Sequence, residues 1–225
     1  MAILKSTKLY KRYLRNNVFI YAINNCNIEV NAGECVVICG EKNSGKSTLL
    51  RLLGGLERPT SGDLSINHKN VSRFNDDELA IVRRKEVGYL FNNDSFISEL
   101  TIHENIIMPA LLAQKKYDEN YYTELTDRLH ISRILSRYPK QVSMSQLQCA
   151  AYARALINKP SIILMDEPND YGYHQMDRDI LEFLLNIVYE YHRTLIMVTN
   201  DPEVSIYVDH IIKLKDGEII EDRRI

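Results

Sequence analysis

The sequence has no excess of charge of either sign. Its 225 residues contain 28 Lys and Arg against 30 Asp and Glu, which gives a formal net charge of −2. Proteins that hold nucleic acid or an anionic lipid surface by electrostatics carry a basic field or a local basic patch, and the sequence shows neither. We therefore expect no nucleic-acid partner.

Long apolar runs and metal-binding patterns are also missing. No apolar run approaches the roughly 18 residues of a membrane span, and the N-terminal MAILKSTKLYKRY lacks the apolar core of a signal peptide, so we expect a cytoplasmic location. The four cysteines form no C-x-x-C pair and the six histidines form no H-E-x-x-H pattern, which argues against a structural metal. What is present, 45% hydrophobic residues, is enough for a packed core.

Short apolar runs and helical segments alternate along the chain. The runs CVVIC, SIILM and TLIMV, at 35–39, 161–165 and 194–198, are typical of buried parallel strands. Segments with helical spacing lie at 47–56, 76–85 and 179–191. This alternation predicts an α/β fold in which helices cover both faces of a mostly parallel sheet.

Two parts of the chain depart from this alternation. Residues 4–13 and 21–30 have the pattern of strands in an antiparallel layer, and IIKLKDGEII at 211–220 predicts a hairpin that turns at Asp216-Gly217. The section from about 93 to 158 carries polar helical segments and no strong strand, which predicts an α-helical subdomain inserted into the α/β core. We expect a single domain over residues 1–225.

The most specific motif follows the strand CVVIC and opens a helical segment. It has the full G-x-x-x-x-G-K-[ST] pattern and consists of Gly40, Glu41, Lys42, Asn43, Ser44, Gly45, Lys46, Ser47 and Thr48. Glycines let backbone N–H groups turn inward around phosphates, and the helix N-terminus adds its positive end. Lys46 is expected to reach the β- and γ-phosphates and the Ser47 hydroxyl to ligate Mg²⁺. These residues, named the phosphate loop below, predict binding of a nucleoside triphosphate.

A second strand supplies the acidic partner that such a loop needs. SIILMDEP ends in Asp166, placed to hold Mg²⁺ through water, and in Glu167, placed to act as general base on the attacking water. An acidic pair after an apolar run is weak evidence alone, but together with the phosphate loop it is strong.

Four further segments complete a family pattern. LYKRY ends in Tyr13, VGYLFNND spans 87–94, YPKQVSMSQ spans 138–146, and IMVTND spans 196–201. With the phosphate loop and Asp166-Glu167, the whole chain resembles the nucleotide-binding subunit of an ATP-binding cassette (ABC) transporter, closest in layout to the lipoprotein-release and macrolide-exporter type. The resemblance implies the P-loop NTPase fold, ATP and Mg²⁺ as ligands, and a separate membrane permease that holds the chain at the inner face of the cell membrane.

The resemblance also assigns roles to single residues. Tyr13 stands where the family stacks an aromatic ring on adenine, and Asn92 stands in place of the Q-loop glutamine that reaches Mg²⁺ or the attacking water. Asn200 replaces the histidine that contacts the γ-phosphate. Residues 142–146 replace the signature LSGGQ, so that Ser143 and Gln146 are kept and both glycines are lost. Residues 169–173 also depart from the family pattern, which usually ends there in Leu-Asp.

The missing glycines bear on the rate of hydrolysis. In the family two subunits close head to tail, and each signature meets the triphosphate held by the other subunit's phosphate loop. Met144 and Ser145 place side chains where glycine lets backbone N–H groups approach the γ-phosphate, so we expect slow or conditional turnover. Adaptation of the neighbouring backbone would instead leave turnover near normal. The second subunit is either the same chain or a related one, and pairing with a related cassette would preserve one intact composite site.

Two other functions are compatible with parts of this pattern. The altered Asn92, Met144 and Asn200 favour an ATP-gated regulatory or mechanotransmitting subunit with little hydrolysis, whereas the retained Glu167 favours an ATPase. A soluble ABC ATPase of DNA repair or translation is disfavoured because there is one cassette and no basic field. For the transporter subunit, we expect an exposed apolar docking groove around 92–112 that receives a permease helix.

Overall fold

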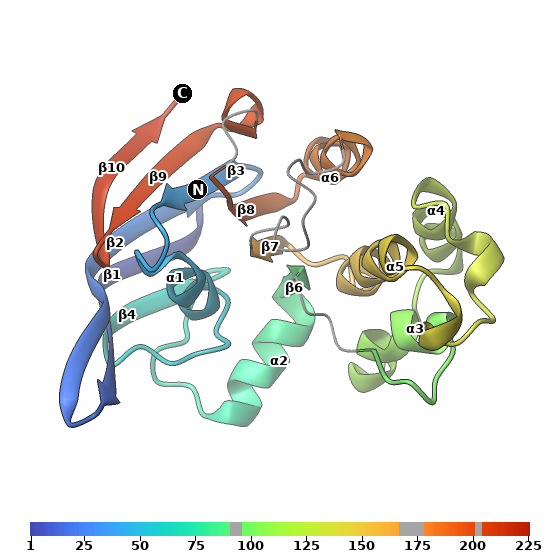
Figure 1. Cartoon of the computed structure of the whole chain (residues 1–225), viewed down its shortest axis with the longest axis horizontal. Coiled ribbons are helices and arrows are strands. Elements are labelled where there is room, and N and C mark those ends of the chain that lie inside the picture. The colour runs from blue at the N-terminus through green and yellow to red at the C-terminus, as the bar shows by residue number, and fades with distance from the viewer. Residues whose placement is uncertain (91–95, 167–177, 201–203) are drawn as a thin grey trace.

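The computed structural model describes residues 1–90, 96–166, 178–200 and 204–225, and it places them in two sheets and a group of helices (Figure 1). The strands are β1 (Ala2–Arg15), β2 (Val18–Asn31), β3 (Cys35–Gly40), β4 (Ser61–Ile66), β5 (Lys69–Asn70), β6 (Val87–Leu90), β7 (Ile162–Asp166), β8 (Thr194–Val198), β9 (His210–Lys215) and β10 (Glu218–Arg224). The α-helices are α1 (Lys46–Leu53), α2 (Asp76–Glu86), α3 (Ile102–Leu112), α4 (Glu119–Arg128), α5 (Met144–Leu156) and α6 (Arg178–Tyr191). Short 3₁₀ turns lie at Ser132–Ile134, Pro139–Gln141 and Val204–Tyr207.

The larger sheet is mostly parallel and has the strand order β10-β9-β3-β8-β7-β6. Only β10 runs antiparallel to its neighbour, β9. The three predicted apolar runs form β3, β7 and β8, which are adjacent and buried, as continuous runs of Val, Ile and Leu require. Since the three strands are parallel, the residues that follow them meet at one edge of the sheet. The phosphate loop, Asp166 and Asn200 therefore come from the same edge.

The smaller sheet is antiparallel, with the order β2-β1-β4-β5. Strands β1 and β2 form a long hairpin whose turn residues, Asn16 and Asn17, have φ angles of 50° and 61°. Asparagine adopts this left-handed conformation more readily than other residues with a side chain, which suits the pair to a tight hairpin turn. Side chains of this sheet pack with α1 and with one face of the larger sheet in a common apolar core.

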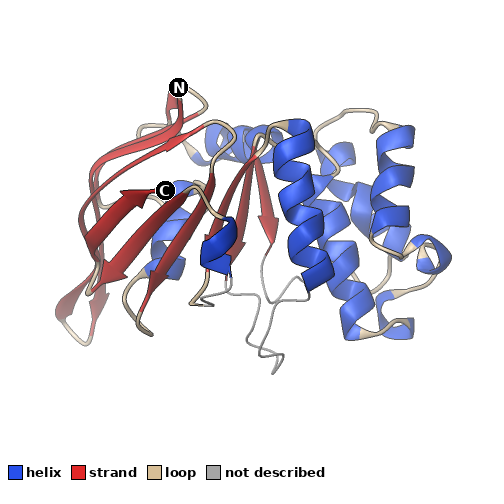
Figure 2. Ribbon diagram, turned by 90° about the horizontal axis from the view of Figure 1, so that it is seen from above, coloured by secondary structure: helices blue, strands red, loops and turns tan. Residues whose placement is uncertain are grey.

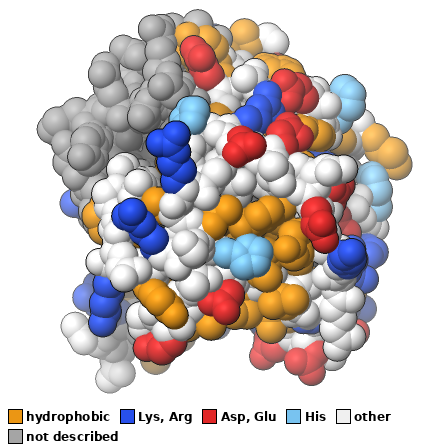
Figure 3. Space-filling view, turned by 90° about the vertical axis from the view of Figure 1, so that its right-hand side faces the viewer, with side chains coloured by type: hydrophobic (Ala, Val, Ile, Leu, Met, Phe, Trp, Pro, Cys, Tyr) orange, Lys and Arg blue, Asp and Glu red, His pale blue; other side chains and the backbone are white. Residues whose placement is uncertain are grey.

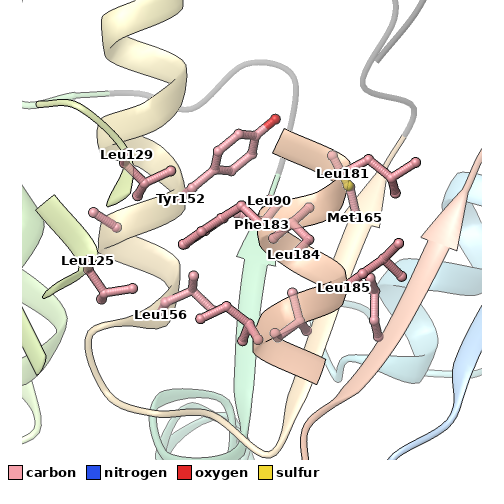
Figure 4. Packing of buried hydrophobic residues seen from close by; sticks show 14 of the residues in the cluster. Leu90, Leu125, Leu129, Tyr152, Leu156, Met165, Leu181, Phe183, Leu184 and Leu185 are labelled. Atoms are coloured by element: carbon pink, nitrogen blue, oxygen red, sulfur yellow. The ribbon is translucent and has the colours of Figure 1, made fainter. Parts of the chain in front are cut away.

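The helices α3, α4 and α5 lie between β6 and β7 in the sequence and form a group beside the strands (Figure 2). A second apolar core joins them to β6, β7 and α6, and Figure 4 shows Leu125, Tyr152 and Leu156 facing Phe183 and Leu184 within it. Capping boxes at Thr101–Glu104 and Ser143–Gln146 begin α3 and α5. In each box the first side chain accepts a hydrogen bond from the backbone N–H of the second residue, and the second side chain accepts one from the backbone N–H of the first. These bonds satisfy N–H groups that would otherwise lack a partner at the start of the helix.

The predicted fold class is confirmed: an α/β core, an N-terminal antiparallel layer and inserted helices. The predicted hairpin at 211–220 corresponds to β9 and β10, with Asp216 and Gly217 at its turn. Strands β4, β5 and β6 were not predicted, because they are short and their apolar residues do not form a clear run. In the part of the chain that the structure describes, no helix combines the length and apolarity needed to cross a membrane.

Candidate nucleotide site

The phosphate loop joins the end of β3 to the start of α1, and two of its glycines are required by the backbone. Gly40 and Gly45 have φ angles of 151° and 102°. A Cβ atom at Gly40 would lie 2.2 Å from the carbonyl oxygen of Leu214, and one at Gly45 would lie 2.3 Å from that of Ala22. Any side chain would both strain the backbone and collide with it, so the loop forms only with glycine at these positions.

Lys46 closes the phosphate loop on itself. Its side chain is buried, and its Nζ donates to the carbonyl oxygens of Gly40 and Glu41, at 2.9 Å each. The ammonium group is thereby held at the start of the phosphate loop, where it is predicted to contact the β- and γ-phosphates. The side chains of Glu41, Lys42 and Asn43 in this loop are exposed.

A buried hydroxyl lies within the same loop. Ser44 is 3% exposed, and its Oγ has no hydrogen-bond partner among the described residues. Buried polar groups normally have a partner, because leaving one unpaired costs about 1–3 kcal/mol. An unpaired hydroxyl, two crowded glycines and a buried lysine in one loop fit a site built to receive phosphate oxygens.

The edge of the sheet brings Ser47 and Asp166 together. Ser47, in the first turn of α1, donates from Oγ to Oδ1 of Asp166 at the end of β7, at 2.9 Å. A hydroxyl and a carboxylate side by side are the oxygen ligands that Mg²⁺ takes beside phosphates. The two residues are 119 positions apart in the sequence. The chemistry of this donor pair therefore fits the predicted metal.

Asn200 lies at the same edge, two residues after β8. Its Oδ1 accepts a hydrogen bond from the backbone N–H of Gly40, at 3.0 Å. The first residue of the phosphate loop is thus bonded to the position where the family has a histidine.

Tyr13 lies beside the first turn of α1. Its hydroxyl donates to Glu57 and also interacts with Thr48, and the Lys11 ammonium lies 5.1 Å from the ring centroid. Partial burial, together with the bond to the Glu57 carboxylate, raises the pKa of the Tyr13 hydroxyl. Tyr13 thus contacts the last residue of the phosphate loop, and its stacking on adenine stays a prediction. Sequence reasoning missed Glu57, which lies just after α1 in no motif.

The signature residues lie on α5, in the helical group rather than beside the phosphate loop (Figure 1). Ser143 caps the helix, with its Oγ accepting the N–H of Gln146 at 3.2 Å, and Gln146 Oε1 accepts the N–H of Ser143 at 3.0 Å. The hydroxyls of Ser143 and Ser145 are 2.9 Å apart. Met144 is 65% exposed at the start of the helix.

Three predicted features lie outside the described residues. They are Asn92, Glu167 and the segment 169–173. The described part of the site therefore consists of the phosphate loop, Asp166, Asn200 and Tyr13, with Ser143 and Gln146 at a separate place on the molecule.

Comparison with known proteins agrees with this geometry. The family model described as "ABC transporter" matches residues 23–170. An ABC transporter ATP-binding protein of Bacillus subtilis, YvcR, is 35% identical over 99% of this chain and 87% of its own length. The bacitracin export ATP-binding protein BceA of Halalkalibacterium halodurans is 33% identical over 97% of this chain and 87% of its own length.

A longer relative and a solved structure extend the comparison. The probable syringafactin export ATP-binding/permease protein SyfD of Pseudomonas syringae is 36% identical over 99% of this chain, which spans only 34% of SyfD. The dimeric structure of MJ0796, a bacterial ABC transporter cassette, superposes with a TM-score of 0.90 at 32% identity and covers 98% of both chains. The chain belongs to the ABC transporter family and is one of its ATP-binding domains.

Proposed function

We propose that this chain binds Mg²⁺-ATP and hydrolyses it as one of two nucleotide-binding subunits that drive a separate membrane permease from its cytoplasmic side. The observation that carries this proposal is the meeting of Ser47 and Asp166 beside the loop closed by Lys46. The names of BceA and SyfD describe export, which supports an exporter as the transporter that this chain drives.

The described residues suggest how the triphosphate is held. Lys46 would exchange its bonds to the Gly40 and Glu41 carbonyls for bonds to the β- and γ-phosphates. Ser47 would ligate Mg²⁺ directly and Asp166 through water, in place of their present bond to each other. The metal would neutralise charge that develops on the phosphate oxygens. Tyr13 would stack on the adenine ring.

Hydrolysis would depend on Glu167 as general base and on Asn92 to orient the attacking water. A composite site would form when the partner subunit's signature meets this triphosphate, as the existence of a dimeric MJ0796 cassette supports. The exposed Met144 and the Ser145 side chain at the start of α5 would stand at that contact. We propose slow turnover for this reason, since a single preorganised donor can be worth roughly 10²–10³ in rate.

The permease would dock on the helical group. Hydrophobic side chains gather around a histidine on the face of the molecule that this group presents (Figure 3). Ile97, Leu111 and Leu112, all within the predicted docking segment 92–112, are each about half exposed. Exposed apolar residues of this kind suit a permanent or recurrent protein partner.

The test measures ATP hydrolysis for three samples: the chain alone, its Glu167→Gln variant, and the chain co-expressed with its permease. We expect transporter-level turnover only in the third sample and none in the variant. A normal rate for the chain alone would contradict slow turnover. ATP-dependent dimerisation without hydrolysis in any sample would instead support a regulatory subunit.

A further inference from the structure

Asn200 holds the phosphate loop in this structure. It follows β8, which pairs in parallel with β3, so Val198 lies beside Ile38, two residues before β3 ends at Gly40. From there the Asn200 side chain reaches back to the N–H of Gly40, with its Oδ1 3.0 Å from that nitrogen. This bond joins the first loop residue to a residue 160 positions away.

This bond fixes the position of Gly40 at the start of the phosphate loop and the orientation of the Asn200 side-chain amide. Gly40 is crowded, since a Cβ atom there would lie 2.2 Å from the Leu214 carbonyl oxygen and 2.9 Å from Ser44 Oγ. The Gly40 carbonyl oxygen accepts a hydrogen bond from Lys46, and the Gly40 N–H donates one to Asn200. Both backbone polar groups of Gly40 are therefore hydrogen-bonded. Because Oδ1 is the acceptor, the side-chain nitrogen is left as a donor.

We propose that Asn200 is a positioning residue that anchors the phosphate loop through Gly40 and thereby sets the affinity for diphosphate and triphosphate alike. This rests on the proposed function, because it concerns the same nucleotide site. A residue that acted only on the γ-phosphate would change binding of ATP and leave binding of ADP unchanged. An anchor of the loop entrance changes both, because both nucleotides use the same loop.

The test compares binding of Mg²⁺-ADP and of the non-hydrolysable Mg²⁺-AMP-PNP to the full chain and to Asn200→Ala. We expect the variant to weaken both nucleotides by the same factor, about fivefold, as for one lost hydrogen bond. The matched control is Asn70→Ala. Asn70 also accepts a backbone N–H at 3.0 Å, that of Ser72, but on the edge strand β5. It should leave both affinities unchanged.

Amide hydrogen exchange at Gly40 in the nucleotide-free protein gives a second readout. Asn200→Ala should speed this exchange about fivefold, whereas Asn200→Asp keeps an acceptor oxygen and should preserve the protection. Unchanged ADP affinity and unchanged Gly40 exchange in Asn200→Ala would overturn the anchor. If the unaltered chain bound neither nucleotide, the proposed function would fail, and the exchange at Gly40 would still decide whether Asn200 anchors the loop.

Discussion

The phosphate loop and the signature segment are both predicted to contact phosphate groups, but their structures differ. The loop is built from inside the chain: Lys46 is buried and bonded to the loop backbone, and Gly40 and Gly45 lie against β9 and β2. The signature segment is a helix start whose Met144 is exposed and whose serines bond to near neighbours. Under the proposed function, the loop can therefore be complete in one subunit, whereas the signature would gain a ligand only from a second.

The largest expected effect concerns the crowded glycines of the phosphate loop. Gly45→Ala should lower the free energy of unfolding by about 3 kcal/mol, because the backbone is left-handed there and Ala22 leaves no room. Gly33→Ala is the matched control: it is also left-handed, with a φ of 84°, but a Cβ atom there meets nothing within 4 Å. It should cost about 1 kcal/mol. Equal losses in urea unfolding would show that crowding is unimportant.

Removal of the loop lysine is expected to act on nucleotide binding. Lys46→Ala should weaken Mg²⁺-ATP about 100-fold, since a hydrogen bond to a charged group contributes up to about 3 kcal/mol. Titration with a fluorescent ATP analogue measures this change. Lys69→Ala, on the edge strand β5, removes an exposed lysine and should leave the affinity as it was. A loss below threefold in Lys46→Ala would argue against the predicted phosphate contact.

Restoring glycines should sharpen the difference between the two segments. The double variant Met144→Gly, Ser145→Gly should raise hydrolysis by the paired subunits about tenfold, because backbone N–H groups can then approach the γ-phosphate. Nucleotide binding by a single subunit should not change. Met144→Ala shortens the side chain without restoring glycine and serves as the comparison. An unchanged rate in the double variant would mean that the present backbone already adapts.

The smallest expected effect separates capping from catalysis. Ser143→Ala and Thr101→Ala each remove the first residue of a capping box and should each cost about 1 kcal/mol of stability. Only Ser143→Ala should also lower hydrolysis by paired subunits, because Thr101 lies in no predicted nucleotide contact. Thermal unfolding and ATPase assays on the same samples distinguish the two effects. An equal loss of hydrolysis in both variants would reduce Ser143 to a helix cap.

Much of the fold was predictable because its signals are local. The apolar runs of β3, β7 and β8 and the helical spacing of α2 and α6 follow from residue patterns within single segments. The strands β4 and β5 were missed, since Ser61–Ile66 and Lys69–Asn70 contain too few apolar residues to show a pattern. Strand β4 pairs with β1, which is distant in the sequence, and β5 pairs with β4.

By itself, the sequence determined the phosphate loop, because glycine, lysine and serine at fixed spacing after a strand leave few other structures. It also determined that Asp166 follows a buried strand. Only the tertiary structure decided that Asp166 meets Ser47, that Tyr13 bonds to Glu57, and that Asn200 accepts from Gly40. These contacts join segments that are remote along the chain, and they exist because parallel strands end at one edge and the hairpin folds back over α1.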